Sequence, residues 1–289
     1  MGFSIKELTY KGKHLLFLTQ QEMAGPWFSF KLTGKKVGVI PIILKNIEPT
    51  PIYKMVNTRT GTLIDRITLD FDIKEYLMKL MKEGKMETLK VKKQHSLIRL
   101  YIDVFNRPKV PYINTFFTLK NISDYDLIDF SMYFVFDFDI NGLEGFDNDF
   151  SGYDDENDII YQYDNTGLYA GFSPISRSTN FETCLTKDFK IDNTKLDLSN
   201  RIYEREGEVL SALQIKFQTL TPDHSFQTAL TISGGSSKEE LIQNIKEGKV
   251  NAIKYLAQVN RSIKSAQRNQ QEEAFLKINL QEGVDCTQK

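Results

Sequence analysis

Short runs of alternating apolar and polar residues are the dominant pattern from Phe3 to about Ser233. The runs are rich in β-branched and aromatic residues, and Asn, Asp, Gly or Pro closes each of them, which is typical of strands and turns. Few helical stretches separate the runs, so antiparallel pairing is favoured over parallel pairing. The clearest runs cover residues 36–40, 98–105, 115–119, 130–137 and 225–232. The pattern predicts a mostly β protein with two antiparallel sheets packed face to face.

A short helix is predicted between two of these strand-like runs. Asp72 can cap a helix over residues 73–83, and Glu75 completes a capping box. Apolar residues recur on one face of this segment at helical spacing, and Gly84 follows as a stop signal. We therefore expect one amphipathic helix that packs on a sheet.

Two further helices are predicted near the C-terminus. Ser237 and Glu240 form a capping box for a helix over residues 238–247, and Gly248 is expected to end it. A longer helix should follow, because apolar residues then recur at helical spacing. These apolar positions are Val250, Ile253, Leu256, Val259, Ile263 and Ala266.

These elements suggest a division of the chain into three parts. A β domain over residues 1–235 is followed by a helical segment over 236–268 and by a weakly held tail over 269–289. The apolar stripe of the helical segment is suited to docking a protein partner or a second copy of the chain.

Charge and composition exclude several classes of protein. The formal net charge is −1, from 37 basic and 38 acidic residues, so we expect neither nucleic acid nor an anionic membrane as a partner. No run approaches 18 apolar residues, and the N-terminus lacks a basic stretch followed by an apolar one. We expect a cytoplasmic protein in which Cys184 and Cys286 are free thiols, because neither has a neighbouring Cys or His.

The charges are unevenly distributed along the chain. The acidic segment, residues 121–176, contains 13 acidic residues and no Lys or Arg, which leaves the rest of the chain at +12. This segment is either a solvated acidic face or a binding surface, because tyrosines alternate with its carboxylates. Sugars are bound by aromatic faces together with fixed carboxylates and amides. The candidate ligand-binding residues are Asp147, Asp149, Tyr153, Asp154, Asp155, Tyr161 and Trp27.

Part of the acidic segment matches the first half of a calcium-binding loop. Asp137, Asp139 and Asn141 alternate as oxygen ligands would, and a glycine follows them. The second half of the calcium-binding loop pattern is not matched, because position 12 is Asn148 instead of a bidentate Glu. We expect no cofactor and a metal-free strand end, and the alternative is Ca²⁺ held by these three residues and completed by Asp147 and Asp149.

Clustered carboxylates repel one another, so the acidic segment needs a source of compensating charge. A bound cation is one source, and Lys and Arg residues from the rest of the chain are the other. We favour the second, because the calcium-loop match is incomplete.

The catalytic motifs that can be recognised in a sequence are absent here. His14, His95 and His224 are the only imidazoles, and there is no Gly-x-Ser-x-Gly and no P-loop. A sugar epimerase needs a general base and a general acid on either side of the ring. His95 or His224 with a carboxylate of the acidic segment could supply that pair, but the sequence assigns no catalytic residue.

Residues 98–247 resemble the N-terminal β-supersandwich domain of prokaryotic glucoamylases, the family 15 glycoside hydrolases. Three stretches carry the resemblance. Residues 99–105 with 117–123 are similar to paired strands and their turn, residues 152–172 to an acidic loop with its returning strands, and residues 236–247 to the closing helix. The resemblance implies a supersandwich of the galactose-mutarotase-like type.

The catalytic part of those enzymes is a barrel of twelve helices, which requires more than ~130 residues. Only 21 residues follow Arg268, so none of the family's catalytic carboxylates can be placed on this sequence. The resemblance therefore implies a stand-alone carbohydrate-associated protein that binds sugar or assists a glycoside hydrolase, without glycosidase activity. The alternatives are a mutarotase-like epimerase and a non-catalytic structural or interaction protein.

Overall fold

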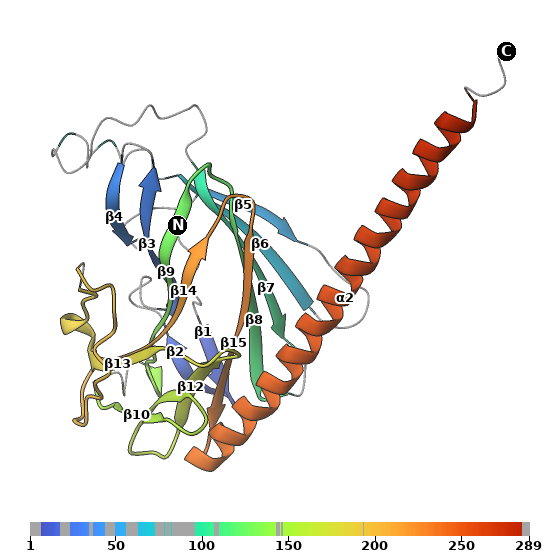
Figure 1. Ribbon diagram of the computed structural model, residues 1–289. Helices are drawn as coiled ribbons and strands as arrows, with labels where there is room; N and C mark the ends of the chain where they lie inside the picture. Colours follow the sequence, from blue (N-terminus) through green and yellow to red (C-terminus); the bar gives the residue numbers. More distant parts are fainter. Residues whose placement is uncertain are drawn as a thin grey trace. The chain divides into compact units, whose positions relative to one another are not determined.

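The computed structural model describes residues 7–17, 24–34, 37–43, 50–55, 63–72, 78, 82, 96–106, 110–142, 145, 147–192 and 194–284. The chain divides into two compact units, Met1–Lys249 and Val250–Lys289. The first unit holds all the described strands, which are shown with the C-terminal helix in Figure 1. The second unit contains the continuation of that helix, and each unit is described by itself.

Strands dominate the first unit, as the alternating pattern predicts. The strands are β1 (Glu7–Tyr10), β2 (Lys13–Phe17), β3 (Ala24–Gly34), β4 (Val37–Ile43), β5 (Thr50–Met55), β6 (Leu63–Asp72), β7 (Ser96–Asn106), β8 (Tyr112–Asn121), β9 (Asp126–Asp137), β10 (Phe150–Asp154), β11 (Ile159–Tyr163), β12 (Tyr169–Pro174), β13 (Asn180–Leu185), β14 (Val209–Leu220) and β15 (Ser225–Gly235). A short 3₁₀ helix, η3, covers Thr186–Asp188, and the helix α2 covers Lys238–Val284.

All the paired strands are antiparallel. Among the described strands, one sheet has eight in the order β10-β11-β12-β15-β8-β7-β6-β5, and the other has five in the order β13-β14-β9-β3-β4. The hairpin β1–β2 forms a small sheet of its own. Two antiparallel sheets with few helices confirm the predicted fold class.

The main core lies between the two large sheets. Phe117 of β8 packs against Phe134 of β9 with ring centroids 5.4 Å apart, and Phe136 of β9 packs against Phe172 of β12 at 4.6 Å. In each pair one residue comes from each sheet, and all four side chains are buried. The aromatic residues of the strands therefore hold the sandwich together by burying large apolar areas.

A second core covers the other face of β9. Residues of a strand alternate between faces, so Tyr133 and Val135 point away from the main core and join a cluster that contains Trp27. Phe189, from the chain that follows η3, packs on Trp27 with ring centroids 5.1 Å apart. The tyrosine hydroxyl of this cluster donates to the carbonyl of Leu196 at 2.6 Å. Both faces of the five-stranded sheet are thus covered at its centre.

The start of α2 packs on the outer face of β11. Leu241 and Ile245 are fully buried against Ile159 and Tyr161. The Ser237 hydroxyl accepts the backbone N–H of Glu240 at 3.1 Å, which confirms the predicted cap at this helix start.

The prediction that Gly248 ends this helix is wrong, because α2 continues through it to Val284. Gly248 is needed for close packing instead. A Cβ at this position would lie 2.3 Å from Cγ2 of Thr231 and 3.0 Å from the ring of Tyr112. The backbone of α2 therefore approaches β15 and β8 more closely than any larger residue permits. One continuous helix replaces the predicted pair.

Two other predictions concern the helices. Of the helix expected over residues 73–83, Met78 and Lys82 are described and have helical backbone, while the other positions lie outside the described residues. Residues 269–284, which the sequence leads us to expect as a tail, belong to α2.

The compact first unit also includes the first turns of α2, whereas the division predicted from the sequence places the end of the β domain at residue 235. None of the described helices is long and apolar enough to cross a membrane.

Candidate functional site

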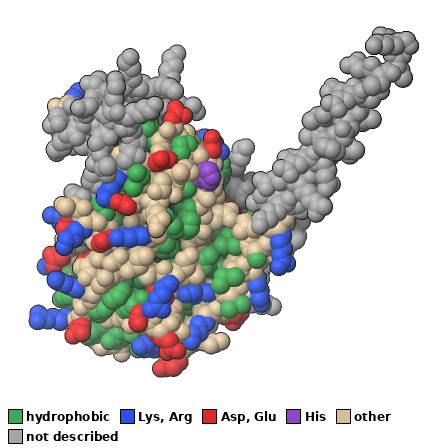
Figure 2. Space-filling model, viewed as in Figure 1, with side chains coloured by type: hydrophobic (Ala, Val, Ile, Leu, Met, Phe, Trp, Pro, Cys, Tyr) green, Lys and Arg blue, Asp and Glu red, His purple; other side chains and the backbone are tan. Residues whose placement is uncertain are grey.

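The carboxylates of the acidic segment are largely bonded within the fold. Asp154 accepts hydrogen bonds from the backbone N–H of Asn157 at 3.1 Å and from its side-chain amide at 3.0 Å. Asp155 is exposed and forms an ion pair with Arg177 at 2.7 Å. Figure 2 shows acidic and basic side chains interspersed over the described part of the face in view, without a continuous acidic patch there.

Tyr153 is held by a network of its own. Its hydroxyl donates to Oδ1 of the buried Asp158 at 2.8 Å, and its ring stacks on Phe181 with centroids 4.1 Å apart. Burial, together with the bond to Asp158, raises the pKa of Tyr153 above its usual range. The Ser178 backbone N–H donates to the second carboxylate oxygen at 2.7 Å. This network connects the β10–β11 turn to the chain before β13. The Phe181 ring covers one face of the Tyr153 ring.

Tyr161 is a packing residue for α2. It is 8% exposed, and the Lys238 ammonium lies 5.1 Å from its ring centroid, within range of a cation–π contact. Gly152, its cross-strand partner on β10, leaves room for the ring, since a Cβ there would lie 2.5 Å from it. The ring is therefore enclosed between the sheet and the helix.

Three other aromatic rings form a row across one edge of the eight-stranded sheet. Phe150, Tyr163 and Tyr169 are cross-strand neighbours on β10, β11 and β12. Their centroids are 5.4 and 5.1 Å apart with interplanar angles of 22° and 14°. These separations are too short for rings lying side by side in one plane, so the rings overlap in offset stacks. The stacked faces are turned toward one another and are not open to a sugar.

Trp27 lies apart from the other candidate ligand-binding residues. It is 6% exposed and belongs to the second core, which contains none of the other six. The structure thus places Trp27, Tyr161 and the end of β10 with Tyr153 and Asp154 in three different environments and does not assemble them into one site.

The candidate calcium ligands lie at the end of β9 and in the turn after it. Asp137 accepts a hydrogen bond from the Thr186 hydroxyl at 3.1 Å. Asn141 adopts a positive φ of 64° and donates its amide to Asp164. Asp164 in turn accepts the backbone N–H of Thr166 at 3.1 Å. These bonds fold the turns that follow β9 and β11 against each other.

The remaining residues of the proposed loop diverge. Asp147 is exposed, whereas Asp149 is fully buried and accepts the Ile140 backbone N–H at 3.4 Å through one oxygen. Its other oxygen, Oδ1, has no hydrogen-bond partner among the described residues. In the described part of the chain, no group of three or more His, Cys, Asp or Glu side chains is arranged to hold a metal ion.

Burial and neighbouring carboxylates raise the pKa values of two of these carboxyl groups. Burial raises the pKa of Asp137 to about 7, and the nearby Asp139 adds to the rise. Burial likewise raises the pKa of Asp149 to about 9, with Asp164 and Asp139 contributing. No Lys or Arg of the described residues pairs with Asp137 or Asp149. The expected compensation by basic residues is found at Asp129 and Asp155 and not at these two acids.

The histidine candidates are not placed at a site by the structure. His224 is exposed in the β14–β15 turn, where its Nδ1 lies 2.8 Å from the Thr221 hydroxyl and 3.1 Å from the carbonyl of Pro222. These contacts stay within its own turn. His95 lies outside the described residues.

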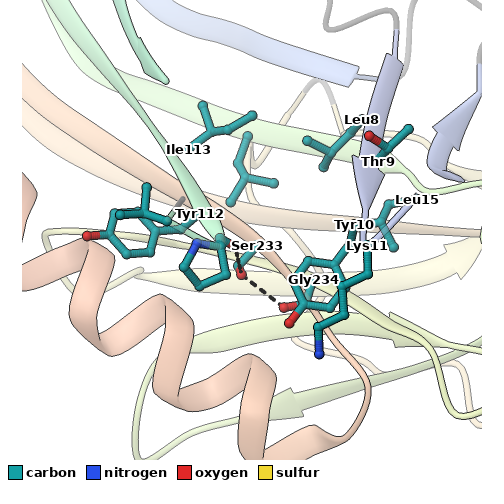
Figure 3. Close-up of a pocket in the computed structure, with 12 residues that line it drawn as sticks. Leu8, Thr9, Tyr10, Lys11, Leu15, Tyr112, Ile113, Ser233 and Gly234 are labelled. Atoms are coloured by element: carbon teal, nitrogen blue, oxygen red, sulfur yellow. Dashed lines mark hydrogen bonds between the residues drawn. The ribbon is translucent and has the colours of Figure 1, made fainter. Parts of the chain in front are cut away.

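A pocket that sequence reasoning missed opens beside the β1–β2 hairpin (Figure 3). Its volume is about 430 Å³, which is within the range of small-molecule sites. Its lining comes from the hairpin (Leu8, Thr9, Tyr10, Lys11, Leu15), from the chain entering β8 (Val110, Pro111, Tyr112, Ile113) and from the end of β15 (Ile232, Ser233, Gly234). Roughly 100 residues separate each part from the next, so no local motif could indicate the pocket.

Two polar groups of this pocket, on Tyr10 and Lys11, are donors held by α2. The Tyr10 hydroxyl and the Lys11 ammonium both donate to Glu240, at 2.8 and 2.9 Å. Burial and this bond raise the pKa of Tyr10, and the bond to Glu240 raises the pKa of Lys11. The same contacts lower the pKa of Glu240 to about 2. The residues that line the pocket include no carboxylate and no imidazole.

Comparison with known proteins supports the fold. No protein-family model and no curated protein sequence matches the chain. Among solved structures, a bacterial glucoamylase in complex with acarbose has a TM-score of 0.53 at 12% identity, over 85% of this chain and 31% of that chain. A polysaccharide lyase has a TM-score of 0.46 at 10% identity, over 84% and 32%. A galactose mutarotase related enzyme from Lactobacillus acidophilus has a TM-score of 0.40 at 8% identity, over 82% and 92%.

The resemblance to the glucoamylase β-sandwich is confirmed at the level of the fold. The chain spans about a third of the length of the glucoamylase that it matches. The fold is thus shared with the part of that glucoamylase which the chain covers. At these identities the match concerns architecture alone, because one fold serves many functions.

Proposed function

We propose that this chain binds a saccharide in the hairpin pocket without hydrolysing it, either as a sugar-binding module or as an accessory to a glycoside hydrolase. The observation that carries the proposal is a ligand-sized pocket with fixed donors, on a fold shared with a glucoamylase domain. Val110, Pro111 and Ile113 contribute half-buried apolar surface for the apolar side of a pyranose. Thr9, Lys11 and Ser233 contribute groups that can bond hydroxyls.

The chemistry of the pocket lining favours binding over catalysis. Glycoside hydrolysis uses two carboxyl groups that flank the scissile bond, and the residues lining the pocket supply neither. Epimerisation needs a base and an acid that exchange protons near neutral pH. Tyr10 and Lys11 both have raised pKa values and remain protonated there. The donors of the pocket can therefore orient hydroxyls but cannot abstract a proton.

Calorimetric titration with glucose, maltose and acarbose tests the proposal, since acarbose is the ligand of the matched glucoamylase structure. We expect saturable binding that Lys11→Met weakens about fivefold or more, because one charged donor is lost. Lys120→Met is the matched control, as Lys120 pairs with Asp223 at the other end of β8. In polarimetry, the protein should not accelerate the mutarotation of fresh α-glucose relative to buffer. Incubation of the protein with maltose, without acarbose, should release no glucose.

Two results would contradict the proposal. Equal affinities in Lys11→Met and wild type would place the ligand elsewhere. Accelerated mutarotation that is lost in His224→Ala would instead favour the epimerase alternative.

A further inference from the structure

Three residues on one face of α2 reach both walls and the floor of the hairpin pocket. Glu240, Asn244 and Glu247 are spaced four and three residues apart, so they lie in line along the helix. The pocket has one wall on β1, another on β8 and its floor on β15 (Figure 3). Each of the three residues contacts a different one of these strands or the turn beside it.

The strongest contact is on the β1 wall. Glu240 accepts the Tyr10 hydroxyl at 2.8 Å, the Lys11 ammonium at 2.9 Å and the Ser236 backbone N–H at 2.7 Å. Its pKa of about 2 keeps it ionised at neutral pH, and hydrogen bonds to an ionised acceptor are stronger than neutral ones. A single carboxylate thus connects the N-terminal hairpin to the start of a helix about 230 residues later in the chain.

The floor and the opposite wall are held by hydrogen bonds from an amide and from a tyrosine hydroxyl. The Asn244 amide donates to the carbonyl of Gly234 at 2.9 Å, and the Tyr112 hydroxyl donates to Glu247 at 3.3 Å. One residue further along, the buried Asn114 amide donates to the carbonyl of Gly248 at 3.1 Å. The helix therefore contacts β15 and β8 as well as the hairpin.

The hairpin depends on such contacts. A two-stranded sheet is marginally stable by itself, and β1–β2 pairs with no other strand among the described residues. Its apolar side is buried, with Leu15 and Tyr10 so close to Gly234 that a Cβ there would lie 2.7 Å from each. Its polar side is fixed through Glu240, so the separation of the two pocket walls depends on where α2 begins.

We infer that the start of α2 is a clamp on this pocket, with Glu240 as the positioning residue, so that occupancy of the pocket and attachment of α2 are coupled. This inference rests on the proposed function only in taking the ligand of the pocket to be a saccharide. Coupling of this kind is reciprocal, because a ligand that prefers the clamped walls also stabilises the clamp. Loss of the Glu240 hydrogen bonds should therefore speed amide exchange in the hairpin. A ligand in the pocket should slow amide exchange in the first turns of α2.

Hydrogen exchange followed by mass spectrometry tests the clamp without a ligand. In Glu240→Ala we expect amide exchange in residues 7–17 to rise about tenfold or more, while exchange in β9 stays unchanged. Glu239→Ala is the matched control, because Glu239 is exposed, carries the same charge on the same turn and interacts with Ser237 of its own cap. Unchanged exchange in residues 7–17 of Glu240→Ala would overturn the clamp.

Tyr10→Phe removes one of the three bonds of the clamp and leaves the helix cap intact. If amide exchange is fast throughout Glu240→Ala, that variant has unfolded, and Tyr10→Phe then tests the clamp in its place. A rise of a few-fold confined to residues 7–17 supports the clamp, and wild-type exchange there refutes it.

Acarbose at saturating concentration tests the coupling. We expect slower exchange in residues 238–248 and an affinity at least threefold weaker in Glu240→Ala than in Glu239→Ala. Binding that leaves both quantities unchanged refutes the coupling. Absence of acarbose binding to the wild type counts against the proposed function, and the ligand-free exchange experiment then decides the clamp by itself.

Discussion

Gly248 of α2 lies so close to Thr231 of β15 that a Cβ on the glycine would sit 2.3 Å from the Thr231 Cγ2 atom. Glycine in the interior of a helix costs about 1 kcal/mol relative to alanine. At Gly248 this cost is offset by the close approach of the helix backbone, which lets Asn114 bond the Gly248 carbonyl.

Gly248→Ala should therefore destabilise the protein, although alanine is the better helix former. We expect a loss of about 1–3 kcal/mol in the free energy of unfolding, as for other overpacked sites. Thr231→Ser removes the Cγ2 atom and keeps the hydroxyl that donates to Asn114, so the double variant should recover part of the loss. Urea denaturation of the single and double variants measures both effects. Higher stability in Gly248→Ala alone would contradict the packing argument.

Trp27 should report on the core and not on a ligand. It is the only tryptophan of the chain, and it is packed on Phe189 in the second core. We expect blue-shifted fluorescence emission that saturating acarbose leaves unchanged. Trp27→Ala should cost about 3–5 kcal/mol of stability, because it empties a buried site. A change in emission on addition of sugar, with unchanged stability in Trp27→Phe, would return Trp27 to the ligand-binding residues.

The strands could be predicted because their signals are local. The run over residues 225–232 lies within β15 (Ser225–Gly235), and the run over 130–137 ends with β9 at Asp137. Alternation and turn residues fix such segments without reference to the rest of the chain. The capping residues Ser237 and Glu240 identified the start of α2 for the same reason.

The pocket and the end of α2 could not be predicted, because they depend on tertiary contacts. Tyr10, Tyr112 and Gly234 are brought together only by the pairing of distant strands. Gly248 resembles a helix stop in sequence, and only the position of Thr231 shows its packing role. Similarly, the composition around Asp149 indicates repulsion between charges, whereas its burial, which raises its pKa to about 9, is seen only in the structure.

The buried acids make stability depend on pH in a predictable direction. The pKa of Asp149 is about 9 in the folded protein and near 3.8 when unfolded, so the folded state retains a proton that the unfolded state has lost between these values. The contribution of this group to stability is therefore fully present below about pH 4 and falls as the pH rises toward 9, by on the order of 1 kcal/mol per pH unit.

Asp149→Asn tests this dependence, since the amide mimics the neutral carboxyl group. We expect the stability of the variant relative to wild type to increase from pH 5 to pH 8.5 in urea denaturation. Asp155→Asn, which removes an exposed ion pair, is the control and should show no such trend. Parallel curves for Asp149→Asn and wild type would mean that Asp149 is ionised in the folded state.

Calcium provides the last test of the acidic segment, because a cation and a proton would compete for the same carboxyl groups. At pH 8.5 Asp137 is largely ionised and Asp149 is partly so, which gives Ca²⁺ its best opportunity to bind. The described carboxylates do not converge on a common point, so we expect 5 mM Ca²⁺ and EDTA to give the same melting temperature. A rise of several degrees with Ca²⁺ that is lost in Asp139→Ala, and is kept in the exposed-site control Asp155→Asn, would show that Asp137, Asp139 and Asn141 are ligands after all. In that case the raised pKa values of Asp137 and Asp149 would describe the metal-free protein, and adding Ca²⁺ should abolish the pH trend of the wild type.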